Sequence, residues 1–173
     1  MYNNSIMNQF EQLRKDGIQL GMCEKFRNLW NENTTLDDLC QMFYSGQDFC
    51  IEHNYPSIEQ ILSLDEDVLV KHHIYASGKH KVSTTEKMII LGDADVELVV
   101  PDYRQIPDIY VRHNAHLTIS LGKYAFAYVS VFDNGSVSVT SKEIGARLCA
   151  SQFGGNIRNE ELFAKIIGKR IRK

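Results

Sequence analysis

Three stretches in the second half of the chain share one pattern: Ile90-Leu-Gly-Asp-Ala-Asp-Val-Glu-Leu98, Val111-Arg-His-Asn-Ala-His-Leu-Thr-Ile119 and Val131-Phe-Asp-Asn-Gly-Ser-Val-Ser-Val139. The copies recur at a nearly constant interval, and a weaker fourth copy is expected around Leu148 to Gly154. Apolar and polar residues alternate on both sides of a central small residue, which is typical of half-buried β-strands. The repeat therefore predicts a β-rich module over residues 73–157.

Two architectures fit this repeat. In a β-solenoid, expected here as a right-handed β-helix, each unit forms one coil and equivalent residues stack about 4.8 Å apart. In an antiparallel β-meander or sandwich, each unit is a hairpin. A hairpin that pairs Val131 with Val137 needs a left-handed residue at Gly135, and the other copies carry alanine there at a cost of about 1 kcal/mol each. We therefore favour the solenoid.

Stacking predicts which equivalent residues lie together. Two apolar sets should lie inside: Val96, Leu117 and Val137, and Leu98, Ile119 and Val139. A polar set should line a corner: Asp93, Asn114 and Asn134. A third set, Asp95, His116 and Ser136, should lie side by side on the outer surface and is the candidate interaction surface.

Residues 1–72 predict a region of short helices. Helical spacing of apolar residues indicates helices over residues 3–16, 22–30, 36–44 and 48–53, with Gly17 as the stop of the first. Thr35 is a typical N-cap, and Ser57-Ile-Glu-Gln60 is a capping-box pattern that opens a further helix to about Leu64.

The end of the chain, residues 158–173, is expected to form a capping helix over 159–168 followed by a basic tail. Such a helix would cover the open end of a solenoid against edge-to-edge pairing. Residues 142–173 carry a net charge of +5, whereas residues 1–141 carry −8. The basic tail is expected to be a solubilising terminus, and the alternative is a contact with a nucleic acid or an acidic partner. The candidate contact residues are Lys165, Lys169, Arg170, Arg172 and Lys173.

The composition points to a folded protein of the cytoplasm. No apolar run approaches the length of a membrane span, so no membrane association is expected. Met1 to Phe10 lacks the pattern of a secretion signal. The four cysteines form no Cys-x-x-Cys pair, which favours reduced, buried thiols.

No motif indicates a catalytic residue, a cofactor or a metal site. His113 and His116 lack a second cluster that would complete a metal site. Asp95, His116 and Ser136 are the residue types of a catalytic triad, but no nearby motif supplies an oxyanion hole. A groove of carboxylates acting on polysaccharide is a further alternative, with candidates Asp93, Asp95, Glu97, Asp102 and Asp108.

The chain resembles an uncharacterised family found in phages and prophages of gut bacteria. The resemblance lies in Leu36-Asp-Asp-Leu-Cys-Gln-Met-Phe-Tyr-Ser-Gly-Gln-Asp-Phe-Cys-Ile-Glu-His53, in His73-Ile-Tyr75 and in Asp108-Ile-Tyr-Val-Arg-His113, and spans most of residues 10–150. It implies an architecture and a phage context rather than an activity. The repeat module is also similar in style to bactofilin-like polymerising modules, from which the large helical region and the polar strand faces depart.

Together these features predict a non-enzymatic protein that binds a protein partner or itself. The expected setting is the host cytoplasm or the virion, as an assembly component or as an inhibitor of a host defence system. A nucleic-acid-associated protein that uses the basic tail is the first alternative. A polysaccharide-active β-helix enzyme is the second.

Overall fold

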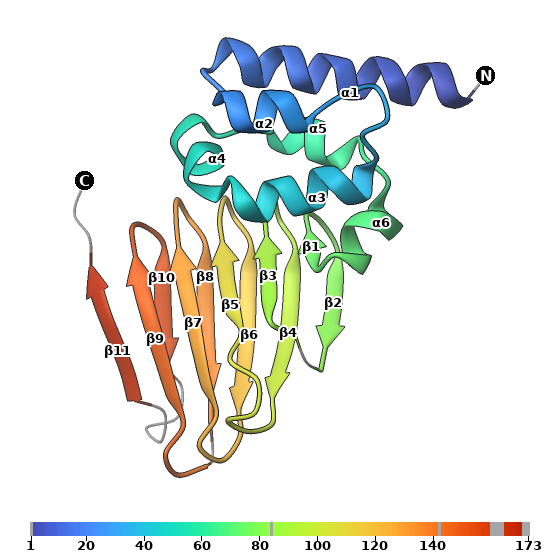
Figure 1. Ribbon diagram of the computed structural model, residues 1–173. Coiled ribbons are helices and arrows are strands. Elements are labelled where there is room, and N and C mark those ends of the chain that lie inside the picture. Colours follow the sequence, from blue (N-terminus) through green and yellow to red (C-terminus); the bar gives the residue numbers. More distant parts are fainter. Residues whose placement is uncertain (1, 84, 142, 160–164, 171–173) are drawn as a thin grey trace. The chain divides into compact units, whose positions relative to one another are not determined.

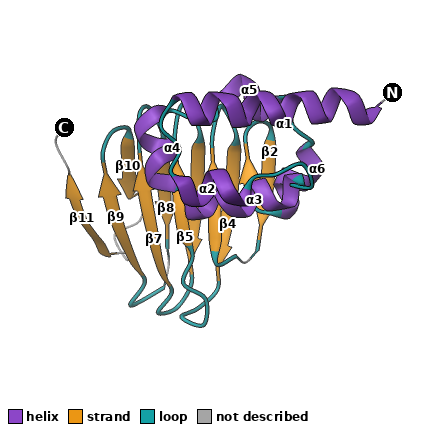
Figure 2. Ribbon diagram, turned by 45° about the horizontal axis from the view of Figure 1, so that its top comes forward, coloured by secondary structure: helices purple, strands orange, loops and turns teal. Residues whose placement is uncertain are grey.

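The chain divides into two compact units, Met1–His72 and His73–Lys173. A computed structural model describes residues 2–83, 85–141, 143–159 and 165–170 (Figure 1). The first unit is helical and the second is built from strands, as the colours of Figure 2 show.

The described part of the helical unit consists of one long helix and several short ones. They are α1 (Tyr2–Gln19), α2 (Glu24–Leu29), α3 (Leu36–Ser45), α4 (Gln47–His53), α5 (Ile58–Leu62) and α6 (Glu66–Lys71). Helices as short as α2 to α6 are marginal in water and depend on a shared core. That core contains Leu13, Met22, Trp30 and Tyr55, with the Tyr55 hydroxyl donating to the Leu13 carbonyl oxygen at 2.7 Å.

Both predicted N-cap residues stand directly before a helix. The Thr35 hydroxyl accepts the amide of Asp38, whose carboxylate accepts the Thr35 amide, and this closes a capping box at α3. Ser57 and Gln60 form the same reciprocal pair at α5. Each box satisfies two backbone donors that a bare helix start would leave unpaired.

The predicted stop of the first helix at Gly17 is wrong, because α1 continues to Gln19. A Cβ at Gly17 would lie 2.4 Å from the Met22 methyl carbon and 3.0 Å from the Tyr55 hydroxyl oxygen. Gly17 therefore packs closely against the core, and a larger residue would displace the flexible end of Met22. The left-handed residue lies beyond the helix at Gly21, with φ of 95°.

The different exposure of two cysteines in the helical unit can be tested by chemical modification. Burial, reinforced by the nearby Asp37 charge, raises the pKa of the Cys40 thiol to about 12, whereas Cys23 is exposed. At about pH 8 only about one Cys40 in ten thousand is then the reactive thiolate. We expect iodoacetamide followed by peptide mass spectrometry to find Cys23 modified and Cys40 intact. Adding urea should expose Cys40, and modification of both at similar rates in the folded protein would contradict the buried site.

The second unit is a parallel β-solenoid. Its strands are β1 (Ile74–Tyr75), β2 (Lys79–Val82), β3 (Lys87–Ile90), β4 (Asp95–Val100), β5 (Asp108–Val111), β6 (His116–Leu121), β7 (Phe126–Val131), β8 (Ser136–Thr140), β9 (Arg147–Gln152), β10 (Asn156–Asn159) and β11 (Lys165–Arg170). Odd-numbered strands form a six-stranded sheet and even-numbered strands a five-stranded sheet. The described strand pairs are all parallel, which excludes the meander. In Figure 1 the strands of one sheet point in the direction opposite to the strands of the other sheet.

The predicted stacking of the three main copies is confirmed. Leu117 pairs with Val96 on one side and Val137 on the other, and Ile119 pairs likewise with Leu98 and Val139. None of these side chains is more than 1% exposed. At the corner, the Asn134 side-chain amide donates to the Asn114 oxygen at 3.1 Å. Parallel stacking with alternate residues buried therefore builds one continuous apolar interior.

The fourth copy lies later than expected. Gln152 at the end of β9 pairs with Val131 and begins this copy. Leu148 lies earlier in β9 and pairs with Ala127, before the start of the third copy. The corners have left-handed residues at Gly92, His113 and Asp133 (φ 59°, 60° and 51°), whereas the hairpin alternative would have needed one at Gly135.

The predicted C-terminal helix is not observed. Residues 160–164 lie outside the described part of the chain, and Lys165–Arg170 form strand β11 instead of the second half of that helix. β11 pairs in parallel with β9 and ends the six-stranded sheet among the described strands. The apolar pair Ile166 and Ile167, which suggested a helix stripe, pairs with Leu148 and Cys149.

Candidate functional site

The predicted interaction surface lies on the outer face of the five-stranded sheet. Asp95, His116 and Ser136 are register neighbours on β4, β6 and β8. The ring of His116 contacts the Ser136 hydroxyl through Nδ1 at 2.8 Å and the Thr118 hydroxyl through Nε2 at 3.2 Å. Asp95 lies 3.6 Å from the Lys79 ammonium. The three residues thus belong to a row of polar groups along the sheet.

Besides Asp95, ion pairs engage two more of the acidic residues proposed for polysaccharide chemistry. Glu97 lies 2.9 Å from Lys81, and the hydrogen bond between them raises the pKa of the Lys81 ammonium. Asp102 accepts from Arg104, which lowers the pKa of the Asp102 carboxyl. General acid catalysis needs a carboxyl whose pKa is raised, and this perturbation is in the opposite direction.

The predicted histidine and the described basic residues have structural places in the solenoid. His113 has a left-handed backbone, and its Nδ1 accepts the Gly92 amide at 3.1 Å. Within the described residues, no three His, Cys, Asp or Glu side chains are grouped to hold a metal ion. Of the basic residues, Lys165, Lys169 and Arg170 belong to β11, and Arg172 and Lys173 lie outside the described residues.

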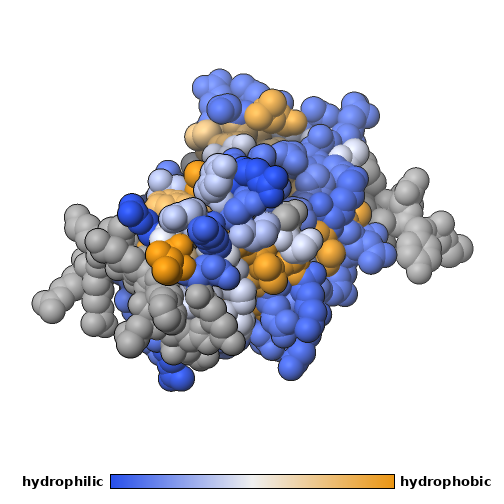
Figure 3. Space-filling view, turned by 90° about the horizontal axis from the view of Figure 1, so that it is seen from below, coloured by the Kyte–Doolittle hydropathy of each residue, from blue (hydrophilic) through white to orange (hydrophobic). Residues whose placement is uncertain are grey.

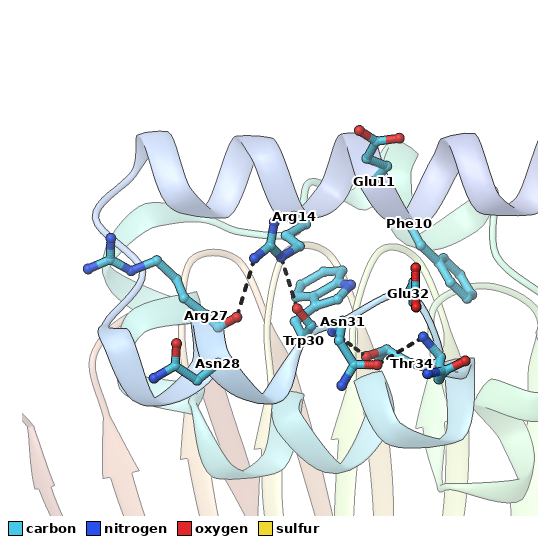
Figure 4. Close-up of a pocket in the computed structure, with 10 residues that line it drawn as sticks. Phe10, Glu11, Arg14, Arg27, Asn28, Trp30, Asn31, Glu32 and Thr34 are labelled. Atoms are coloured by element: carbon cyan, nitrogen blue, oxygen red, sulfur yellow. Dashed lines mark hydrogen bonds between the residues drawn. The ribbon is translucent and has the colours of Figure 1, made fainter.

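A pocket of about 760 Å³ opens in the helical unit (Figure 4). Its lining residues come from α1, from α2 and from the segment after α2, and they are Phe10, Glu11, Arg14, Arg27, Asn28, Trp30, Asn31, Glu32, Asn33 and Thr34. Arg14 donates from Nε to the Trp30 carbonyl at 3.0 Å and from Nη2 to the Arg27 carbonyl at 3.4 Å. The guanidinium of Arg14 therefore ties α1 to the end of α2 and satisfies backbone acceptors there.

An exposed apolar cluster lies on the three connections that follow β4, β6 and β8, which are residues 101–107, 122–125 and 141–146. Tyr103 is 67% exposed, Ile106 50%, Tyr124 55% and Ile144 73%. We call these four residues the apolar ridge. Figure 1 shows the three connections side by side, and Figure 3, seen from that end, shows hydrophobic groups among hydrophilic ones.

Close backbone packing holds the ridge together. A Cβ at Gly122 would lie 2.0 Å from the Pro101 carbonyl oxygen, so the second connection rests directly on the first. A Cβ at Gly145 would lie 2.4 Å from the Tyr124 ring, so this ring packs on the backbone beside Ile144. The Lys123 ammonium lies 5.4 Å from the centre of the same ring. The three connections are therefore stacked in contact, and they carry the four ridge residues on adjacent coils.

Sequence reasoning missed the ridge, although a signal for it exists. Tyr103, Tyr124 and Ile144 recur at the same interval as Ala94, Ala115 and Gly135 of the repeat. They fall outside the repeated motif, in connections of unequal length. Extending the alignment into these connections would have revealed a large hydrophobic residue at one position of three successive coils.

Comparison with known protein families, curated proteins and solved structures finds no match for this chain. Among the described residues, no helix has the length and apolar character needed to cross a membrane.

Proposed function

We propose that this chain is a non-enzymatic interaction or assembly protein that binds a protein partner through the apolar ridge. The observation that carries the proposal is the recurrence of an exposed large hydrophobic residue at one repeat position on three successive connections. A monomeric surface rarely gathers such residues in one place, because their hydration is unfavourable. A bound protein surface would remove them from water.

The solenoid gives this surface a rigid support. The side chains of Val96, Leu117 and Val137 directly inside the coils are at most 1% exposed. A ridge fixed by such a core loses little conformational freedom on binding, and this loss is a main cost of association. Tyrosines add large contact areas with few rotatable bonds.

The polar outer face supports a non-enzymatic role, since Asp95 and Glu97 are held there by neighbouring lysines. The resemblance to phage and prophage proteins supports a role in particle assembly or in the inhibition of a host defence system. Both roles require a specific protein contact and no turnover.

Site-specific photocrosslinking tests the proposal. We expect p-benzoylphenylalanine at position 124 in place of Tyr124 to give a discrete protein adduct in the native host. The same probe in place of Ser138, on the outer face of the five-stranded sheet, is the matched control and should give none. Equal adducts at both positions, or no adduct at position 124, would refute the ridge as the binding surface.

A further inference from the structure

We infer that the protein bound by the ridge is a second copy of this chain, related by a twofold axis that passes between the second and third connections. This inference rests on the proposed function and names its partner. It is carried by the charges that accompany the ridge.

Charged residues directly precede Tyr103, Tyr124 and Ile144 of the ridge, and their signs alternate from coil to coil. Lys123 and Glu143, both exposed, stand directly before Tyr124 and Ile144. Asp102 holds the same place before Tyr103 and is already paired with Arg104. Among the residues that the structure describes, the second and third connections thus present Lys123 and Glu143, each next to a large apolar side chain.

A twofold axis between these connections makes the ridge complementary to itself. It sets two ridges antiparallel, with Tyr124 opposite Ile144 of the second copy and Lys123 opposite Glu143 of the second copy. Because both copies share the same coil spacing of about 4.8 Å, the rows stay in step. Each contact occurs twice, as in any isologous dimer.

The neighbouring arrangement is electrostatically unfavourable. An axis through the second connection would set Lys123 against Lys123 of the second copy and Asp102 against Glu143 of the second copy. Like charges across an interface oppose association. The charge pattern therefore favours a second copy as the partner and a twofold axis between the second and third connections.

The size of the ridge predicts a weak dimer. Three coils span only about 10 Å along the solenoid. The area that the two ridges bury is therefore at the low end of the range for specific interfaces. We expect a dissociation constant on the order of 10 µM.

Sedimentation velocity of the full chain over a concentration series tests the inference. Lys123→Glu and Glu143→Lys should each raise the dissociation constant about tenfold or more, because each sets like charges together twice. The double variant exchanges the two signs and should return to within about threefold of the unmodified chain. The matched control is Lys81→Glu with Glu97→Lys, an exchange within an ion pair on the sheet face, which should leave dimerisation unchanged.

Three results would overturn the inference. The first is a chain that stays monomeric at every concentration; if position 124 still crosslinks to a different protein, the proposed function stands while the second-copy partner is rejected. The second is a dimer that is insensitive to both single variants, which places the contact elsewhere. The third is a double variant as weak as the single ones, which rejects the position of the axis. Loss of every adduct at position 124 would reject the proposed function itself.

Discussion

Replacing Leu117 with alanine should lower the free energy of unfolding by about 3 kcal/mol. Leu117 is fully buried between Val96 and Val137 in the middle of the solenoid. Truncation removes apolar contacts and leaves a cavity that the two neighbouring coils cannot fill without shifting their hydrogen-bonded strands. Urea unfolding followed by circular dichroism measures the change.

The adjacent residue of the same strand provides the control for this prediction. Thr118 points to the outer face and is partly exposed, so Thr118→Ser, which keeps the hydroxyl that contacts His116, should change the free energy of unfolding by no more than about 0.5 kcal/mol. Similar losses for the two variants would contradict the alternation of buried and exposed residues along β6.

Replacing Gly122 with alanine should cost roughly 3 kcal/mol, because the new methyl group meets backbone and not a movable side chain. Its Cβ would lie 2.0 Å from the Pro101 carbonyl oxygen and 2.7 Å from the Pro101 carbonyl carbon. The second connection would have to lift off the first, against the hydrogen bond from the Gly122 amide to the Val100 carbonyl at 2.8 Å. Chemical denaturation of the variant measures the loss.

Gly21→Ala is the matched control, since it tests glycine conformation without a steric clash. Gly21 has φ of 95° and no atom within 4 Å of an added Cβ, so the cost should stay near about 1 kcal/mol. An equal or smaller loss at Gly122 would show that the connections are not stacked in contact.

The register of the solenoid could be predicted because two independent features of the sequence determine it. The repeat interval fixes which residues are equivalent, and alternation fixes which of them face inward, so the neighbours of Leu117 and Ile119 followed directly. The earliest coil escaped notice because it is shorter: Lys79 pairs with Asp95, and these two lie closer together in the sequence than Asp95 and its next partner, His116.

The errors have identifiable physical causes. Ile166 and Ile167 follow two acidic residues after an asparagine, which resembles a helix start, yet pairing with β9 takes the segment into the sheet. Tertiary pairing of this kind overrides local propensity. The ridge was missed because its residues lie in the connections, outside the repeated motif, where alternation no longer separates the exposed Tyr124 from the buried Tyr110.

The position of every ridge residue depends on successive repeats lying over one another in parallel. Nuclear Overhauser contacts between backbone protons test this most directly. We predict contacts from the Val137 amide to the backbone of Leu117, and from the Ser136 amide to Ala115, whose carbonyl oxygen it meets at 2.9 Å. Contacts between Val131 and Val137, as in a hairpin within one repeat, would contradict the parallel stacking.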